Sequence, residues 1–453
     1  MPDDIVYKNN IVLSDYDFQR DIDNRLCMAE LSLFDVDILR EIVDGSLKIS
    51  IKQLARDFDA SIGQLASTLN KFKETRLIKI DGDAIVVDKE MRKYYESQIM
   101  KFDHSFEPDL EYFQSLLYKV PIHHLPNWYS IAGMADNIFL AIVERYLLTA
   151  KSYQTYLKHL KFKNPVMHAI VDEVFAAPDF QISAQALMTK YKLPRQQFEE
   201  QMLHLEYSLT CCLGYQRQGD IWEEVVTPYH EWRTYLRFLR DNAPKPISNV
   251  KSIVRTHEDD FGFLKDLAAL IEIVIETEIK LQKGDFSPAQ LKQFFGHISA
   301  EKRSGYGQRL LTAISGLELA LITPSLIKPT PSAHEWLYKS LQEHTQQLIS
   351  YQCKQMQEKM RDYHELVNNL NPLVKKGWFF LDDFIKGLTA AVGSVPSVTL
   401  RNKGKKWRYM TPTYGEEEVA FVRHVILNLL FERGAVATGT VGDRLCFALL
   451  HQA

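Results

Sequence analysis

The sequence predicts a mainly helical α+β protein made of small modules in tandem, and three observations support this. Hydrophobic residues recur with helical periodicity through most of the 453 residues. Short alternating stretches, each divided by a turn, interrupt that pattern at four places. A Thr-Pro step followed by His-Glu-Trp occurs twice, in "VTPYHEWRTYL" and "PTPSAHEWLYKSL". Several domains are expected at this length rather than one core.

The first module lies near the N-terminus. A helix with Phe34, Ile38 and Ile42 on one face is followed by two helices that serine residues can cap. Alternating residues then predict two strands joined at Asp81-Gly82-Asp83. Three helices and a two-stranded wing are the pattern of a winged helix-turn-helix. The capping serines are Ser50 and Ser61.

The third helix of this module is a candidate DNA-contacting element, because such helices enter the major groove in DNA-binding winged helices. We expect Lys71, Lys73 and Arg76 to contact phosphates. The same residue types are also common on a solvated helix, and the module as a whole is not basic. The side chains expected to be exposed are Gln64, Ser67, Thr68, Asn70, Lys71 and Lys73.

The same order of elements recurs three more times along the chain. Strands at Leu209–Tyr215 and Trp222–Val226 flank a predicted turn, and Ser287 caps a later helix that begins with Pro288. The predicted organisation is an N-terminal segment (1–30), winged helix 1 (31–100), a helical spacer (101–163), winged helix 2 (164–241), a linker with winged helix 3 (242–340), a long connecting helix (341–369) and winged helix 4 (370–453).

The two His-Glu-Trp stretches resemble half of a zinc motif. The motif H-E-x-x-H needs a second histidine four residues after the first, but those positions hold Thr234 and Tyr338. We therefore expect Trp232 and Trp336 to pack the following helix against the wing, with His and Glu on the surface. No phosphate-binding loop, nucleophile elbow or paired-carboxylate motif occurs, so we expect no enzyme activity, metal or cofactor.

Two other patterns were considered for chemistry. Cys211 and Cys212 are adjacent in a predicted strand, so they point to opposite faces and are expected to be buried thiols. The stretch "TLRNKGKKWRYMTP" (399–412) predicts a basic hairpin or loop inside winged helix 4, suited to phosphate contact. The alternative is a solvated loop with its tryptophan in the core. The proposed contact residues are Arg401, Lys403, Lys405, Lys406, Trp407 and Arg408.

Composition limits the classes of function. The net charge of −4 gives no general attraction to nucleic acid, so any basic surface is local. No apolar run is long enough to span a bilayer, and the acidic N-terminus lacks a secretory h-region. Five scattered cysteines indicate a reducing compartment. A cytoplasmic, intracellular protein without a membrane partner is expected.

The C-terminal stretch resembles a known family. "GWFFLDDFIKGL", a Trp-containing insertion, "EEEVAFVRHVILNLLFERGAVATG" and a closing hairpin resemble the helicase-associated winged-helix segments of XPB-type helicases, over less than a fifth of the chain and without the motor domains. The resemblance implies an accessory that holds nucleic acid or a protein partner.

Two functions from different classes remain open. The first is DNA binding or DNA-associated assembly, including transcription regulation. The alternative is a protein–protein scaffold, which the acidic third helix "RQQFEEQMLHLE" of winged helix 2, expected to be exposed, favours. A ligand-sensing domain around Trp128 is a third option.

Overall fold

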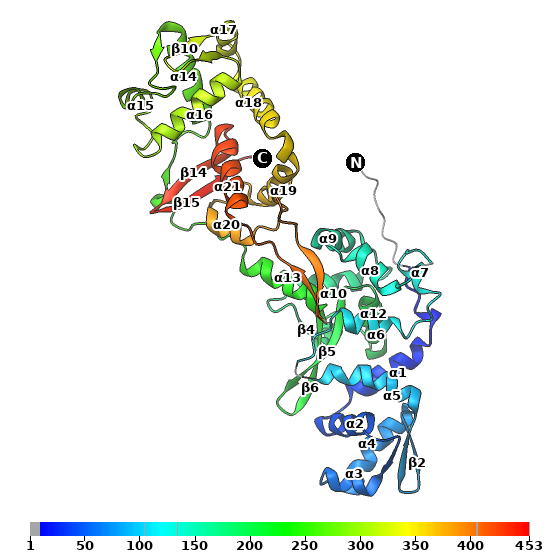
Figure 1. Ribbon diagram of the computed structural model, residues 1–453. Coiled ribbons are helices and arrows are strands. Elements are labelled where there is room, and N and C mark those ends of the chain that lie inside the picture. Colours follow the sequence, from blue (N-terminus) through cyan, green and yellow to red (C-terminus); the bar gives the residue numbers. More distant parts are fainter. Residues whose placement is uncertain (1–9, 104, 134, 405, 453) are drawn as a thin grey trace. The chain divides into compact units, whose positions relative to one another are not determined.

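The chain is an α+β protein of short helices and small antiparallel sheets (Figure 1). The computed structural model describes residues 10–452 except 104, 134 and 405. The chain divides into two compact units. Unit 1 contains the residues up to 237 together with 399–410, and unit 2 contains 238–398 together with the residues from 411 onward.

One six-element repeat dominates the described residues, where it occurs four times, twice in each unit. Each repeat runs helix, short strand, helix, helix, strand, strand. The short strand pairs antiparallel with the last strand, which also pairs with the strand before it. The four sheet orders are β1-β3-β2, β4-β6-β5, β8-β10-β9 and β11-β15-β14, the last extended by β7.

The first repeat forms as the sequence pattern predicts. The side chains of Ser50 and Ser61 accept hydrogen bonds from backbone N–H groups in the first turns of their helices. Gly82 takes the left-handed backbone conformation that the tight turn requires. Ile42 and Leu65 lie in one buried core. The elements are α2 (Leu33–Asp44), β1 (Lys48–Ser50), α3 (Ile51–Asp57), α4 (Ile62–Glu74), β2 (Ile78–Asp81) and β3 (Ala84–Val87).

The second repeat also has its predicted hairpin, and both Cys211 and Cys212 are buried free thiols in its first long strand. The expectation that its acidic third helix is exposed is wrong, because Glu199 and Glu206 are fully buried. The elements are α10 (Pro165–Ala176), β4 (Ile182–Ser183), α11 (Ala184–Tyr191), α12 (Arg195–Tyr207), β5 (Cys211–Gln218) and β6 (Ile221–Pro228).

Helices before, between and after these repeats complete unit 1, and the predicted spacer is helical where it is described. Trp128, within the spacer, is buried. The elements are η1 (Leu13–Asp15), α1 (Phe18–Ala29), α5 (Lys89–Ile99), η2 (Met100–Phe102), α6 (Leu110–Leu117), α7 (Leu125–Trp128), α8 (Ile138–Tyr146), α9 (Ala150–His159) and α13 (His230–Asp241), whose last residues belong to unit 2.

Unit 2 holds the third and fourth repeats. Ser287 caps its helix and Pro288 stands in the first turn, as predicted. The third repeat is preceded by η3 (Val250–Ser252) and β7 (Val254–Arg255), and consists of α14 (Gly262–Glu276), β8 (Ile279–Lys280), α15 (Pro288–Phe294), α16 (Arg303–Gly316), β9 (Ala320–Ile322) and β10 (Leu326–Pro329). The fourth consists of α19 (Met360–Leu370), β11 (Trp378–Phe380), α20 (Leu381–Gly387), α21 (Glu416–His424) continued by η6 (Val425–Leu430), β14 (Val436–Val441) and β15 (Arg444–Leu449), with η5 (Asn371–Leu373) after α19.

The long connecting helix predicted at 341–369 is wrong. The segment is divided at Met356, whose backbone leaves the α-helical conformation, into α18 (Leu341–Gln355), η4 (Gln357–Lys359) and α19. It is preceded by α17 (Pro331–Leu337), and Ser340 starts α18 by forming a capping box with Glu343, in agreement with the predicted start. His344 stacks on buried Trp336 with ring centroids 3.6 Å apart, which fixes the turn between the two helices.

None of the described helices has both the length and the apolar character that crossing a bilayer requires.

Candidate functional site

The basic stretch of the sequence is a two-stranded ribbon, β12 (Thr399–Lys403) and β13 (Lys406–Met410). Arg401 lies directly opposite Arg408, and Lys403 directly opposite Lys406. Because opposite residues share a face and side chains alternate along a strand, these four cations occupy one face of the ribbon. The other face carries the pairs Leu400–Tyr409 and Asn402–Trp407. We call the face that carries Arg401, Lys403, Lys406 and Arg408 the cationic face.

The face opposite the cations docks the ribbon onto unit 1. Leu400 is buried, and its backbone N–H donates to the carbonyl oxygen of Leu148 over 2.9 Å. The Tyr409 hydroxyl donates to the carbonyl oxygen of Leu147 over 3.0 Å. Trp407 is half-buried, with its ring edge-on to Phe139. The predicted hairpin is therefore present, but its predicted place inside the fourth module is wrong, because it belongs to unit 1.

The cationic face is exposed to solvent. Arg401, Lys403, Lys406 and Arg408 are all exposed, and none forms an ion pair with another residue that the structure describes. Lys405, also expected to contact phosphate, lies outside the described residues. Like charges directly across a ribbon destabilise it, and two such pairs occur side by side here. A ribbon with this unfavourable charge arrangement is suited to an anionic partner.

The third helix of the first repeat, α4, offers less positive charge than its sequence indicates. Lys73 and Arg76 are exposed. Lys71, however, donates to the Asp35 carboxylate over 2.8 Å and to the Glu30 carbonyl over 3.2 Å. The expected exposure of Thr68 is wrong, because its buried hydroxyl donates to the same Asp35 carboxylate.

The third helix of the second repeat, α12, is held in a buried ionic network. The Arg25 guanidinium donates to Glu199 over 2.7 Å and to Glu206 over 2.9 and 3.1 Å. Lys101, also buried, lies 3.8 Å from Glu206. Burial alone would raise the pKa of Glu206, but the charges of Arg25 and Lys101 outweigh it and lower this pKa to about 2.

The third helices of unit 2 are also poorly placed to meet phosphates. On α16, Arg309 donates to the Asn428 side chain over 2.5 Å and to the Leu427 carbonyl over 3.2 Å, so it faces the fourth repeat. The first turn of α21 carries Glu416, Glu417 and Glu418, whose negative charge would repel a phosphate.

The first His-Glu-Trp stretch lies beneath the ribbon. Trp232 and its counterpart Trp336 are buried, as predicted. The prediction that both glutamates are surface residues holds for Glu335 but is wrong for Glu231, which is buried. The Leu110 N–H donates to Glu231 over 3.0 Å. Burial raises the pKa of Glu231 to about 8, and nearby Asp109 and Glu111 add to the shift.

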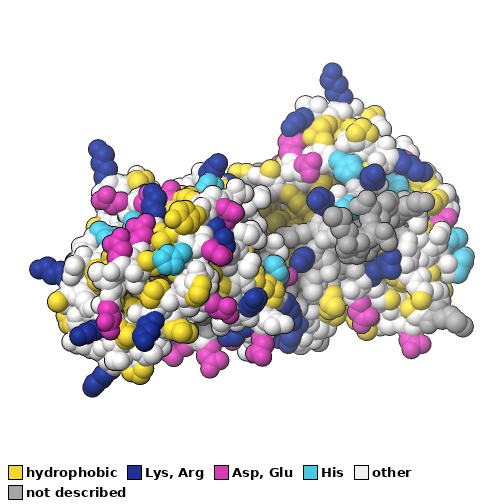
Figure 2. Space-filling view, turned by 90° about the horizontal axis from the view of Figure 1, so that it is seen from above, with side chains coloured by type: hydrophobic (Ala, Val, Ile, Leu, Met, Phe, Trp, Pro, Cys, Tyr) yellow, Lys and Arg dark blue, Asp and Glu magenta, His cyan; other side chains and the backbone are white. Residues whose placement is uncertain are grey.

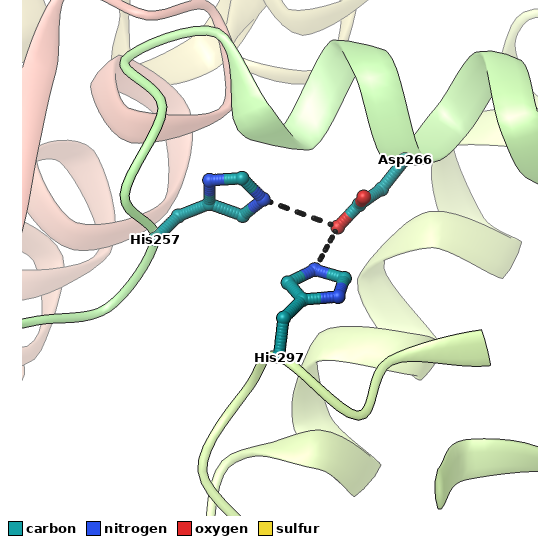
Figure 3. A group of neighbouring side chains, drawn as sticks. All are labelled: His257, Asp266 and His297. Carbon is teal, nitrogen blue, oxygen red and sulfur yellow. Dashed lines mark hydrogen bonds and ion pairs between the residues drawn. The ribbon is translucent and has the colours of Figure 1, made fainter. Parts of the chain in front are cut away.

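Unit 2 contains a group of side chains that the sequence did not single out: His257, Asp266 and His297 (Figure 3). The Nε2 atoms of His257 and His297 lie 3.6 and 2.8 Å from Asp266 Oδ2. The Tyr306 hydroxyl donates to the same oxygen over 2.6 Å. Although burial raises the pKa of Asp266, hydrogen bonds from His257, Tyr306 and His297 lower it overall. No spacing rule links residues so far apart in sequence, so only the fold brings them together.

Comparisons with known proteins identified no relative of this chain. No protein-family model matches the chain, and no curated protein matches it. The surface charge also gives no broad signal, because Figure 2 shows basic and acidic side chains interspersed on the face that it draws. The candidate functional site therefore rests on the local geometry of the ribbon.

Proposed function

We propose that the chain is a non-catalytic tandem winged-helix protein that binds a nucleic-acid backbone through the cationic face of its ribbon, in DNA-associated assembly or transcription regulation. The observation that carries this proposal is the strand register, which puts four cations on one exposed face, none of them in an ion pair with a described residue. Arginine and lysine contacts to phosphates supply most of the affinity of non-specific nucleic-acid binding.

Winged helices are supported by the recurring order of elements and by the sheet order common to the four repeats. In this interpretation each repeat is one module, with β2–β3, β5–β6, β9–β10 and β14–β15 as the wings. The XPB-like resemblance fits the fourth module, which holds the matching segments. Its motor domains have no counterpart in the sequence, which favours an accessory role.

The mode of binding would differ from that of a winged helix that reads bases. The third helix α12 is buried, Arg309 of α16 faces another repeat, and α21 begins with acidic residues. A two-stranded ribbon is narrow enough to enter the roughly 12 Å major groove, and its cations would also reach a single strand. We therefore propose phosphate contact through the ribbon, with Lys73 of α4 and Arg76, two residues beyond its end, as a second, smaller contact.

The test is the salt dependence of binding to a 20-base-pair duplex. Four phosphate contacts would give a slope of about −3.6 in a plot of log K against log salt concentration. Changing Arg401, Lys403, Lys406 and Arg408 together to Gln should flatten most of this slope. A control protein with the same loss of charge has Gln at four exposed lysines of unit 2, Lys251, Lys280, Lys292 and Lys328, and should keep it. Equal slopes for the two variants would contradict the proposal.

The alternative, a protein–protein scaffold, is favoured by one observation. The buried network around Arg25 uses the face of α12 that a DNA-binding module would present. Failure of the unmodified protein to bind duplex or single-stranded DNA at low salt would favour this alternative.

A further inference from the structure

We propose that His257, Asp266 and His297 form a binding site for a divalent first-row transition-metal ion such as Zn²⁺. Their candidate ligand atoms all lie within 4.8 Å of one another. Metal bonds to histidine nitrogen and carboxylate oxygen are about 2.0–2.2 Å long, so two ligands of one ion lie roughly 3–3.5 Å apart. The 2.8 and 3.6 Å separations at Asp266 bracket that range.

Three separate segments of unit 2 supply the ligands. His257 comes from the loop before α14, Asp266 from α14, and His297 from the loop between α15 and α16 (Figure 3). The His257 ring lies against the first turn of α14, where a Cβ on Gly262 would come 2.0 Å from its Nδ1 atom. Glycine at 262 therefore leaves the space that His257 needs to reach the other two residues.

The carboxylate of Asp266 is prepared for a ligand role. Tyr306 binds its Oδ2 atom, while Oδ1 accepts no hydrogen bond from the residues that the structure describes. Metal-bound carboxylates are commonly oriented by such a hydrogen bond. Two imidazoles and one carboxylate suit Zn²⁺, Co²⁺ or Ni²⁺ better than Ca²⁺ or Mg²⁺, which prefer oxygen ligands. The His297 side chain is 43% exposed, which leaves one side of the site open to water.

Metal binding would require one local rearrangement. The Asp259 N–H donates to His257 Nδ1 over 3.0 Å, so without metal the ring proton is on Nε2, where it points at Asp266. A metal ion at Nε2 needs that proton on Nδ1 instead, and the Asp259 N–H would then have to turn away. The Asp259 carboxylate, two residues after His257, already accepts hydrogen bonds from the Phe261 N–H and from Lys265. It can also accept a hydrogen bond from the relocated Nδ1–H in a carboxylate–histidine–metal arrangement.

The experiment is calorimetric titration of the full-length protein with Zn²⁺, without DNA. The unmodified protein should bind one ion, and His297→Ala should weaken binding at least tenfold. The matched control is His334→Ala, an exposed histidine outside the group, which should bind as tightly as the unmodified protein. Equal affinity in all three proteins, or no binding to the unmodified protein, would overturn the proposal.

Two further measurements protect this test from a folding artefact. Co²⁺ bound to the unmodified protein should show visible d–d absorption without a thiolate band, and His297→Ala should lose that absorption while retaining the metal-free melting temperature. Asp259→Asn should weaken Zn²⁺ binding about 10- to 100-fold if its carboxylate accepts a hydrogen bond from the Nδ1–H of His257. An Asp259→Asn affinity equal to that of the unmodified protein would contradict the rearrangement.

Discussion

The protonation state of Glu231 depends on its burial beside the ribbon. The cavity beside it is lined by Tyr153, Trp232, Leu400 and Tyr409. Its Oε1 atom accepts the Leu110 N–H, whereas its Oε2 atom has no hydrogen-bond partner in the described structure. Removing a carboxylate from water without a counter-charge favours the neutral acid, so the folded protein holds Glu231 protonated near neutral pH.

The raised pKa of Glu231 predicts a pH-dependent stability. The folded-state pKa of about 8 exceeds the ordinary value of 4.5, so the stabilising contribution is complete below pH 4.5 and is lost as pH rises toward 8. The loss is on the order of 1 kcal/mol per pH unit across that window. Glu231→Gln cannot ionise. We expect the unmodified protein to lose more unfolding free energy than Glu231→Gln between pH 5 and pH 8. Urea unfolding of both proteins at the two pH values measures this difference.

A control separates Glu231 from a second buried acid with a raised pKa, Glu432. Burial raises the pKa of Glu432, in unit 2, to about 7, so it titrates in the same window. Glu432→Gln should remove its own part of the pH dependence and leave that of Glu231 unchanged. If Glu231→Gln and the unmodified protein had parallel stability curves from pH 5 to 8, Glu231 would not be buried as an acid.

At this scale, local sequence identifies side-chain types but not their partners. The indole of Trp232 is predictably buried because it is large and apolar. The fate of Glu199 and Glu206 depends on Arg25, which lies 174 and 181 positions away. A charged residue on a helix looks solvated unless its partner is known, and for that reason α12 was expected to be exposed. The two glutamates are seven residues apart and therefore lie on one face of the helix. That spacing was the one local indication that both could meet a common partner.

Among the elements, the ribbon combines one face that packs against unit 1 with another face that carries two repulsive pairs. Lys403 and Lys406 flank its turn, and Arg401 and Arg408 form the next pair on the same face. Replacing one member of a like-charge pair by glutamate converts repulsion into attraction, which is worth on the order of 0.5 kcal/mol across strands. The same change removes a proposed phosphate contact.

Lys406→Glu should therefore change stability and binding in opposite directions. We expect a small rise in ribbon stability, seen as slower hydrogen exchange at residues 399–410, and weaker duplex binding at low salt. Lys292→Glu, at an exposed lysine of α15, is the charge-matched control and should leave both measurements unchanged. Loss of ribbon protection together with loss of binding would instead mean that Lys406 maintains the fold of the ribbon.

Elements with local causes were predictable, and elements whose ends depend on tertiary contacts were not. Ser50, Ser61 and Ser287 start their helices through hydrogen bonds to residues three positions on, which a sequence pattern displays. The break at Met356 has no such signal, because no glycine or proline stands there and the helical periodicity continues across it. The stacking of His344 on Trp336 is a further contact that periodicity does not encode.

For the whole molecule, the least predictable feature is which unit each segment joins. The ribbon lies in sequence between two parts of unit 2, yet its contacts are with unit 1. Its hydrogen bonds join Tyr409 to Leu147 across 262 positions, and no local pattern specifies such a pairing. The sequence did indicate a hairpin and its charge, because alternation and a central glycine are local properties.

Removing the ribbon should deprotect a defined part of unit 1. Thr399 and Met410 are paired, so their Cα atoms lie only about 5 Å apart and a Gly-Ser linker can replace residues 399–410. The deletion takes away the donor to Leu148 and the Tyr409 ring that packs against Trp232. Hydrogen exchange should then accelerate at residues 147–153 and 229–235, which the ribbon contacts, and stay unchanged at 416–449 in the fourth repeat. Unchanged exchange in the first two segments would mean that the ribbon is not docked in solution, whereas faster exchange throughout unit 1 would make it part of that unit's core.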